Sequence, residues 1–221
     1  MPRVKEEHYE NKRLEIMEAA KRVALKKPIY HVTMRDVVLE AGMSQGGVYK
    51  YFSNIDELFA SLLGQNSLTS EVKDEINAIF AEAKDPKQVL HDFLTYVGTY
   101  IETSVRGSGK IIHELMAFYA NEPERLENIS SQLLKASTLG YLHTACIGFL
   151  QAQAAAKRIA PVVPLEEVIA FMATTINGIV HDAIMAQNAA YARHLMPAPN
   201  VDRLMHSLYL SVMSLLGIEK R

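Results

Sequence analysis

The sequence has few of the features that mark secreted, membrane or disulfide-bonded proteins. It contains a single cysteine, Cys146, so no disulfide can form within the chain. It has no uninterrupted apolar run of about 18 residues, the length that suggests a membrane-spanning helix. The first segment, MPRVKEEHYENKR, is charged and lacks the apolar centre of a signal peptide. We therefore expect a cytoplasmic protein that does not associate with a membrane.

The sequence also lacks the common motifs of metal sites and enzymes. Its 8 histidines are widely spaced, and no two lie closer than twelve residues, which excludes the paired histidines of zinc-binding helices. No glutamate stands three residues before a histidine, as it does in di-iron helix bundles. The chain carries no nucleophile elbow and no dinucleotide fingerprint, and residues 107–110 lack the upstream glycine of a phosphate loop. We predict no catalytic residue, metal, cofactor or enzymatic activity.

Helical spacing of apolar residues recurs through the chain, whereas strand signals are almost absent. A first helix is expected from about Glu7 to Leu25, because Pro28 cannot continue its hydrogen-bond ladder. Later helices are expected after Asp85-Pro86, from Ile111 to Tyr119, from Glu122 to about Arg158, and after the prolines at 161/164 and 197/199, with a loop at 104–109. With 49% apolar and 22% charged residues, the sequence predicts a soluble all-α fold of about nine helices.

Residues 33–52 predict two short helices joined by a glycine-containing turn. Thr33 is a good N-cap for a helix that ends at Gly42, and Ser44 is a good N-cap for a third helix expected from Gln45 to Tyr51. Two short helices joined in this way form a helix-turn-helix, whose second helix enters the major groove of DNA. The tyrosines and the lysine near the end of that helix offer donors to phosphates and base edges.

The charge of the chain is unevenly distributed. Residues 1–55 hold ten Lys and Arg against seven Asp and Glu, a net charge of +3, whereas residues 56–221 hold thirteen against eighteen, a net charge of −5. A local positive excess alone is usually a solvated surface. Here the excess coincides with the helix-turn-helix pattern, and positive charge favours binding to the DNA backbone. The two features together indicate that the N-terminal part binds DNA.

The N-terminal residues resemble the signature of the TetR/AcrR family of transcriptional regulators. The match covers about residues 10–63 and rests on Arg13, Ile16, Ala19, Ala20, Thr33, Met34, Val37, Val38, Ala41, Gly42, Met43, Ser44, Gly47, Val48, Tyr49, Tyr51, Phe52, Glu57, Leu58 and Phe59. Three positions depart from the family pattern: Pro28 replaces a glycine, Ala24 a phenylalanine, and Ile55 a lysine that often contacts phosphate. Beyond residue 63 the resemblance extends only to length and helix count.

The resemblance implies a DNA-binding domain at 1–55 and a helical ligand-sensing and dimerisation domain at 56–221. It assigns the DNA surface to Thr33, Arg35, Ser44, Gln45, Gly46, Gly47, Tyr49, Lys50 and Tyr51, and it assigns Val48 and Phe52 to the core. The implied function is a repressor that binds a palindromic operator as a homodimer and is released by a small apolar or aromatic effector. The alternative is a helix-turn-helix protein that has lost specific DNA binding and serves in protein interactions.

A fourth helix is expected from Asn54 to about Ala83, where it would cross the domain border and act as the lever between the two sites. Aromatic, methionine and histidine residues of the later helices have the composition of a ligand pocket, which combines apolar walls with a few polar groups. The candidate ligand-binding residues are Phe93, Tyr96, Tyr100, Met116, Tyr119, His143, Phe149 and Met172. An ordinary core role for these residues remains open.

The last two predicted helices are candidates for the dimer interface. The helix from Leu165 to about Asn188 is apolar nearly all round, so it must be covered on both sides. The final helix carries a stripe formed by Leu204, Leu208, Val212 and Leu215. In the TetR/AcrR family, these two helices pair with their symmetry mates in a four-helix interface. Gly178 permits close helix approach and favours the interface over the alternative that both helices are internal.

Overall fold

The computed structural model describes residues 2–63, 69–81, 85–104, 109–128, 138–187, 193–194 and 197–218. Every regular element within these ranges is helical, which confirms the predicted fold class. The chain divides into two compact units, and each combines two separate stretches of sequence. The first unit comprises Met1–Ser67 and Lys110–Ser137, and the second comprises Leu68–Gly109 and Thr138–Arg221.

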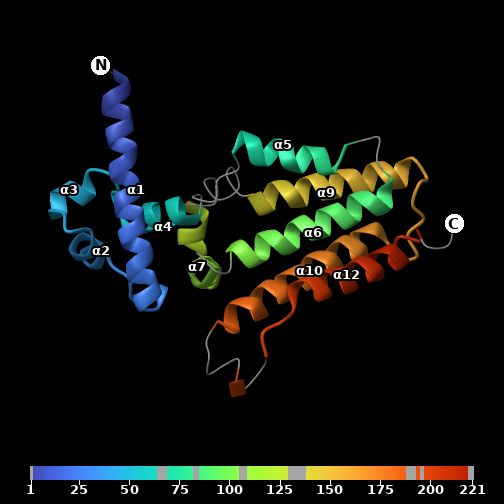
Figure 1. Ribbon diagram of the computed structural model, residues 1–221. Helices are drawn as coiled ribbons and strands as arrows, with labels where there is room; N and C mark the ends of the chain where they lie inside the picture. The colour runs from blue at the N-terminus through green and yellow to red at the C-terminus, as the bar shows by residue number, and fades with distance from the viewer. Residues whose placement is uncertain are drawn as a thin grey trace. The chain divides into compact units, whose positions relative to one another are not determined.

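The first unit packs helices from both of its sequence stretches around one core (Figure 1). Its elements are α1 (Pro2–Lys26), η1 (Ile29–His31), α2 (Met34–Ala41), α3 (Gln45–Tyr49), α4 (Ile55–Leu63) and α7 (Lys110–Ala120). Each α-helix buries at least one apolar side chain in that core, for example Ile16, Val37, Val48, Phe59 and Leu115. Since α4 and α7 bury their apolar faces there, the unit extends beyond residues 1–55.

The second unit is a bundle of α5 (Ser70–Ile79), α6 (Pro86–Ser104), α9 (Thr138–Ala155), α10 (Leu165–Met185) and α12 (Val201–Leu215). The helices expected after Asp85-Pro86 and after the two later proline breaks are confirmed. In Figure 1, α12 lies alongside α6 and α10, and α12 contacts both of them. Gly98 of α6 allows this packing, because a Cβ at that position would lie 3.3 Å from Met205 Cγ.

The prediction of a single helix from Asn54 to about Ala83 is wrong. α4 ends at Leu63, and α5 begins at Ser70 in the other unit. Thr69 caps α5, since its hydroxyl accepts the Val72 N–H at 3.3 Å and so starts a new hydrogen-bond ladder. Both helices keep their apolar stripes, so the spacing of apolar residues did not reveal the break. The proposed lever role of one continuous helix therefore loses its basis.

Some expected boundaries lie partly outside the described residues. The helix expected from Glu122 to about Arg158 begins at Pro123, its stretch 129–137 is not described, and α9 covers Thr138–Ala155. Residues 105–108 of the expected loop and the expected end of the next helix near Asn188 also lie outside those ranges. α1 and α10 agree with the predicted helices within a few residues, except that α1 starts earlier, at Pro2.

Candidate nucleic-acid interface

The helix-turn-helix is fixed by short-range caps, as its sequence predicts. Thr33 Oγ1 accepts the Asp36 N–H at 3.3 Å, and the Asp36 carboxylate accepts the Thr33 N–H at 2.8 Å, which forms a capping box at the start of α2. Gly42 ends α2 with φ of 64°, a left-handed conformation that glycine adopts without strain. Ser44 caps α3 by accepting the Gly47 N–H at 3.1 Å.

Lys27 strengthens the capping box through an ion pair with Asp36. Its side-chain hydrogen bond, together with that of Thr33, lowers the pKa of Asp36 from 3.8 to about 2. The carboxylate therefore stays charged at the N-terminus of α2, where negative charge is favourable to the helix dipole. The capping box and the ion pair thus stabilise the start of α2, and α3 packs against α2.

α3 presents one polar face to solvent. Tyr49 is 43% exposed, and Gln45 and Lys50 are also exposed, whereas Val48 is fully buried. A Cβ at Gly46 would have no neighbour within 4 Å, so the backbone there is open to close approach by a ligand such as DNA. α3 and its C-cap Lys50 therefore expose an aromatic hydroxyl, an amide, an ammonium group and bare backbone to solvent.

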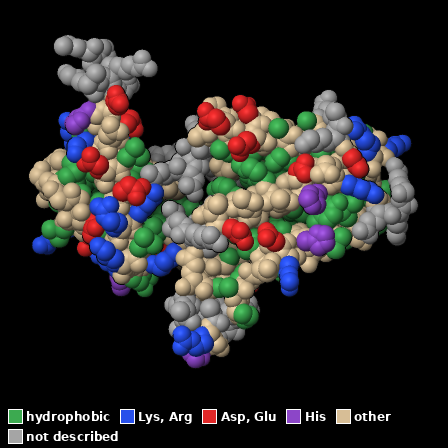
Figure 2. Space-filling model, viewed as in Figure 1, with side chains coloured by type: hydrophobic (Ala, Val, Ile, Leu, Met, Phe, Trp, Pro, Cys, Tyr) green, Lys and Arg blue, Asp and Glu red, His purple; other side chains and the backbone are tan. Residues whose placement is uncertain are grey.

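Most of the cations that the structure describes in the first unit are already paired. Figure 2 shows Lys and Arg side chains gathered over α1, interleaved with acidic side chains, and Arg22 and Lys26 both bind Glu40 at 2.8 Å. Arg35 and Lys50 differ, because neither makes an ion pair within the part of the chain that the structure describes. These two exposed cations are therefore available for phosphates.

The position of Tyr51 differs from the prediction that this residue lies on the DNA surface. Only 9% of it is exposed, and its ring packs against Tyr9 with centroids 4.8 Å apart. Its carbonyl accepts a hydrogen bond from Arg13 at 2.8 Å, while the Arg13 guanidinium lies 4.3 Å above the Phe52 ring. Tyr51 thus joins the end of α3 to α1. The other predicted DNA residues are exposed, apart from Gly47, which is half-buried under the Ser44 cap.

Residues far along the chain complete the first unit. Asp56, at the start of α4, accepts hydrogen bonds from the Tyr119 hydroxyl at 2.9 Å and from Arg125 Nη2 at 2.6 Å. Burial, and then the neighbouring Asp56 carboxylate, raise the pKa of Tyr119. At the opposite end of α7, Lys110 donates to the Ala24 carbonyl at 3.2 Å, and Glu114 accepts the Ile29 N–H at 3.0 Å. No short-range signal in the sequence pointed to these contacts.

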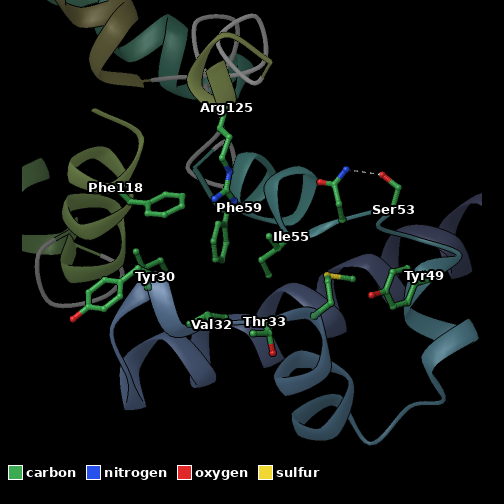
Figure 3. A pocket seen from close by; sticks show the side chains of 12 residues that line it. Tyr30, Val32, Thr33, Tyr49, Ser53, Ile55, Phe59, Phe118 and Arg125 are labelled. Atoms are coloured by element: carbon green, nitrogen blue, oxygen red, sulfur yellow. Dashed lines mark hydrogen bonds between the residues drawn. The ribbon is translucent and has the colours of Figure 1, made fainter. Parts of the chain in front are cut away.

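A pocket of ≈ 330 Å³ lies beside α3 within the first unit. Figure 3 shows Thr33 and Tyr49 on one side, with Phe59, Phe118 and Arg125 on the other. None of the eight predicted ligand-binding residues lines it. Because it shares Thr33 and Tyr49 with the predicted DNA surface, this pocket belongs to the candidate nucleic-acid interface.

The predicted ligand-binding residues divide between the two units. Phe93, Phe149 and Met172 are buried in the core of the second unit, where Tyr96 and Tyr100 are half-buried and His143 is exposed. Met116 and Tyr119 belong to the first unit, and the Tyr119 hydroxyl donates a hydrogen bond to Asp56. Phe80, which is not among the predicted ligand-binding residues, lies 5.6 Å from Phe93 and 5.7 Å from Phe149 between ring centroids.

The expected interface helices leave apolar surface uncovered. By length and composition alone, α10 could cross a membrane. Only 22% of its most apolar 18-residue stretch is buried within the chain. Phe171 of α10 is 42% exposed, and Leu204 and Leu210 of α12 are also exposed. Of the predicted α12 stripe, Leu208 and Val212 are instead buried in the core of the unit. Among the described residues, no cluster of His, Cys, Asp or Glu has the size of a metal site.

Residues 16–62 match the family model described as bacterial regulatory proteins, tetR family. The uncharacterized HTH-type transcriptional regulator YfiR of Bacillus subtilis is 47% identical over 62 residues, which span 28% of this chain and 30% of YfiR. The HTH-type transcriptional regulator TtgR of Pseudomonas putida is 28% identical over 168 residues, which span 72% of this chain and 77% of TtgR. The similarity to YfiR thus covers less than a third of either chain.

The similarity in fold extends over nearly the whole chain. The crystal structure of NalD, the secondary repressor of the MexAB-OprM multidrug efflux pump in Pseudomonas aeruginosa, superposes with a TM-score of 0.66. The superposition covers 91% of this chain and 96% of NalD, at 17% sequence identity. Because the sequence identity is low, the superposition shows that the two proteins share a fold and shows nothing further about their function.

Proposed function

Because this chain belongs to the TetR family and is a transcriptional regulator with a helix-turn-helix DNA-binding domain, we propose that it is a repressor that binds a palindromic operator as a homodimer and is released by a small effector. The observation that carries the proposal is the exposed face of α3, where Gln45, Tyr49 and Lys50 point outward while Val48 anchors the helix in the core. A DNA-binding role, and no enzymatic one, fits this surface.

DNA recognition in this proposal combines base contacts with phosphate contacts. Tyr49 and Gln45 reach base edges or phosphates from α3, and Gly46 lets the backbone approach the groove. Arg35 and Lys50 neutralise phosphates, since they are the exposed cations near this face that lack an ion pair among the described residues. Thr33 and Ser44 lie at the N-termini of α2 and α3, where backbone N–H groups also favour phosphate.

Homodimerisation is supported by the uncovered apolar face of α10 and α12. A soluble monomer rarely exposes a long apolar helix, and a two-fold dimer would cover this one. Gly178 lies on the exposed side of α10, and a Cβ there would have no neighbour within 4 Å, so a partner helix can approach closely. Two half-sites read by such a dimer would supply the specificity that one recognition helix lacks.

Effector sensing is assigned to the second unit, and α7 is proposed to carry the signal. α7 follows α6 in the chain, yet it belongs to the core of the first unit. Its contacts from Lys110, Glu114 and Tyr119 reach α1, η1 and α4. An effector that favours one position of α6 would thereby bias the position of the DNA-binding helices. The effector site and the DNA-binding site would then be coupled, because the effector shifts the populations of the two conformations. This replaces the lever role predicted for a continuous fourth helix.

DNA retardation tests the proposal directly. The full chain is titrated into a labelled fragment from upstream of its own gene, with excess unrelated DNA as competitor. A discrete shifted complex that survives the competitor supports a specific operator. Binding that disappears in step with the competitor would favour the alternative function, a helix-turn-helix protein that has lost specific DNA binding.

A further inference from the structure

Gln153 of α9 is an unusual residue in the core of the second unit. It is 5% exposed, and its Oε1 is the one buried side-chain nitrogen or oxygen without a hydrogen-bond partner among the described residues. A buried amide oxygen that lacks a donor costs about 1–3 kcal/mol of stability, so such groups are rare in folded proteins. A residue kept only for packing would be expected to be apolar at this position.

The surroundings of Gln153 are apolar and aromatic. One turn earlier on the same face of α9 lie Phe149 and Leu150, which are both buried. The Phe149 ring neighbours Phe80, which in turn neighbours Phe93. Gln153 is thus buried on the same face of α9 as Phe149, and Phe149 belongs with Phe93 to the core of the second unit.

We propose that Gln153 is the polar anchor of the effector site, and that the effector is a largely aromatic molecule bearing one N–H or O–H donor. The donor binds the Gln153 amide oxygen, and the aromatic body packs against the phenylalanine cluster. This inference rests on the proposed function of the second unit as an effector sensor. In an apolar site, a carbonyl oxygen with no other hydrogen-bond donor discriminates strongly against ligands that lack an N–H or O–H group. Binding such a ligand would leave the oxygen unpaired.

Indole and benzofuran form a matched pair of probes for this site. Both are flat bicyclic molecules of nearly the same size, but indole carries an N–H where benzofuran carries an oxygen. Binding of each probe to the full chain is measured by isothermal titration calorimetry without DNA. The wild-type protein is expected to bind indole more tightly than benzofuran by a factor of about ten.

Two variants separate the anchor from a general effect on α9. Gln153→Met keeps the length of the side chain but removes the amide, so it should abolish the preference for indole while its melting temperature stays equal or rises. Gln151→Met makes the same change at an exposed position of the same helix and should keep the preference. Circular dichroism checks that both variants retain the wild-type helix content.

Three results would overturn the proposal. They are binding of neither probe by the wild-type protein, equal affinity for the two probes, or an unchanged preference in Gln153→Met. Equal affinity would mean that the Gln153 oxygen does not select for an N–H donor. The comparison of the two probes on the wild-type protein needs no variant, so it remains decisive if Gln153→Met does not fold. Failure here leaves operator binding intact in the retardation assay, whereas failure of the proposed function appears in that assay.

Discussion

Arg125 binds Asp56 with two nitrogens, Nε at 3.1 Å and Nη2 at 2.6 Å, although 69 positions separate the two residues. The Tyr119 hydroxyl donates to the same carboxylate, and the Arg125 guanidinium lies 4.6 Å from the centre of the Phe118 ring. Asp56 lies in the first turn of α4, the helix that directly follows the helix-turn-helix. The segment after α7 is therefore joined to α4 through one carboxylate.

Removing this anchor should weaken the first unit. Arg125→Met keeps an apolar stem beside Phe118 but leaves Asp56 with Tyr119 alone. Since the pair is partly exposed, the expected loss in the free energy of unfolding is about 1 kcal/mol, measured by urea denaturation. Lys12→Met is the control, because it removes a pair between exposed neighbours on α1 and should change stability little. Equal stabilities of the two variants would show that the anchor contributes nothing.

Asp36 should make stability depend on pH in acid. Its pKa is about 2 in the folded chain and 3.8 in the reference state, so its contribution is complete above about pH 4 and is lost as the pH falls toward 2. The free energy of unfolding of the wild type should therefore fall over this window more steeply than that of Asp36→Asn. Glu10→Gln, which removes an exposed carboxylate of α1, should keep the wild-type slope. Parallel curves for wild type and Asp36→Asn would refute the capping role.

Cys146 should report on the packing of the second unit. It is the single cysteine of the chain, and burial raises the pKa of its thiol to about 12. Because only the thiolate attacks a disulfide reagent, the native protein should react with Ellman's reagent at pH 8 far more slowly than the urea-unfolded chain does. Equal rates in the two states would mean that this part of the core opens readily.

The exposed apolar face should be needed for dimerisation. Phe171→Glu places a charge on the uncovered side of α10, where a dimer would bury it without a partner. We expect the mass measured by light scattering to fall from dimer to monomer while the circular dichroism spectrum stays helical. Val162→Glu, at an exposed apolar site of the same unit, should leave the mass unchanged. An unaltered dimer of Phe171→Glu would place the interface elsewhere.

Features set by neighbouring residues were predictable from the sequence. The caps at Thr33 and Ser44 and the glycine end of α2 follow from local hydrogen bonding and backbone freedom, and the structure confirms them. The break between α4 and α5 was missed because the apolar stripe continues on both sides of Thr69. Spacing reports which face a residue lies on, but it does not report whether the backbone hydrogen bonds run without interruption.

Contacts between distant segments were not predictable in the same way. Asp56 and Arg125 are ordinary surface charges by sequence, and only folding brings them together. Tyr51 carries the same chemistry as Tyr49, yet the approach of Tyr9 from α1 decides that one is buried and the other exposed. Gln153 stands in an apolar stretch of α9, and its unpartnered oxygen is visible only once its neighbours are placed.

The most direct measurement is the affinity of Tyr49→Ala for operator DNA by fluorescence anisotropy, beside wild type and Leu14→Ala. Leu14 has a similar exposure, 45%, but belongs to α1. Tyr49→Ala should lose about 1–3 kcal/mol of binding free energy while remaining folded and dimeric, and Leu14→Ala should bind as the wild type does. Wild-type affinity should also fall as salt rises, since phosphate contacts release counterions. Unchanged affinity of Tyr49→Ala would contradict the assignment of α3 as the recognition helix.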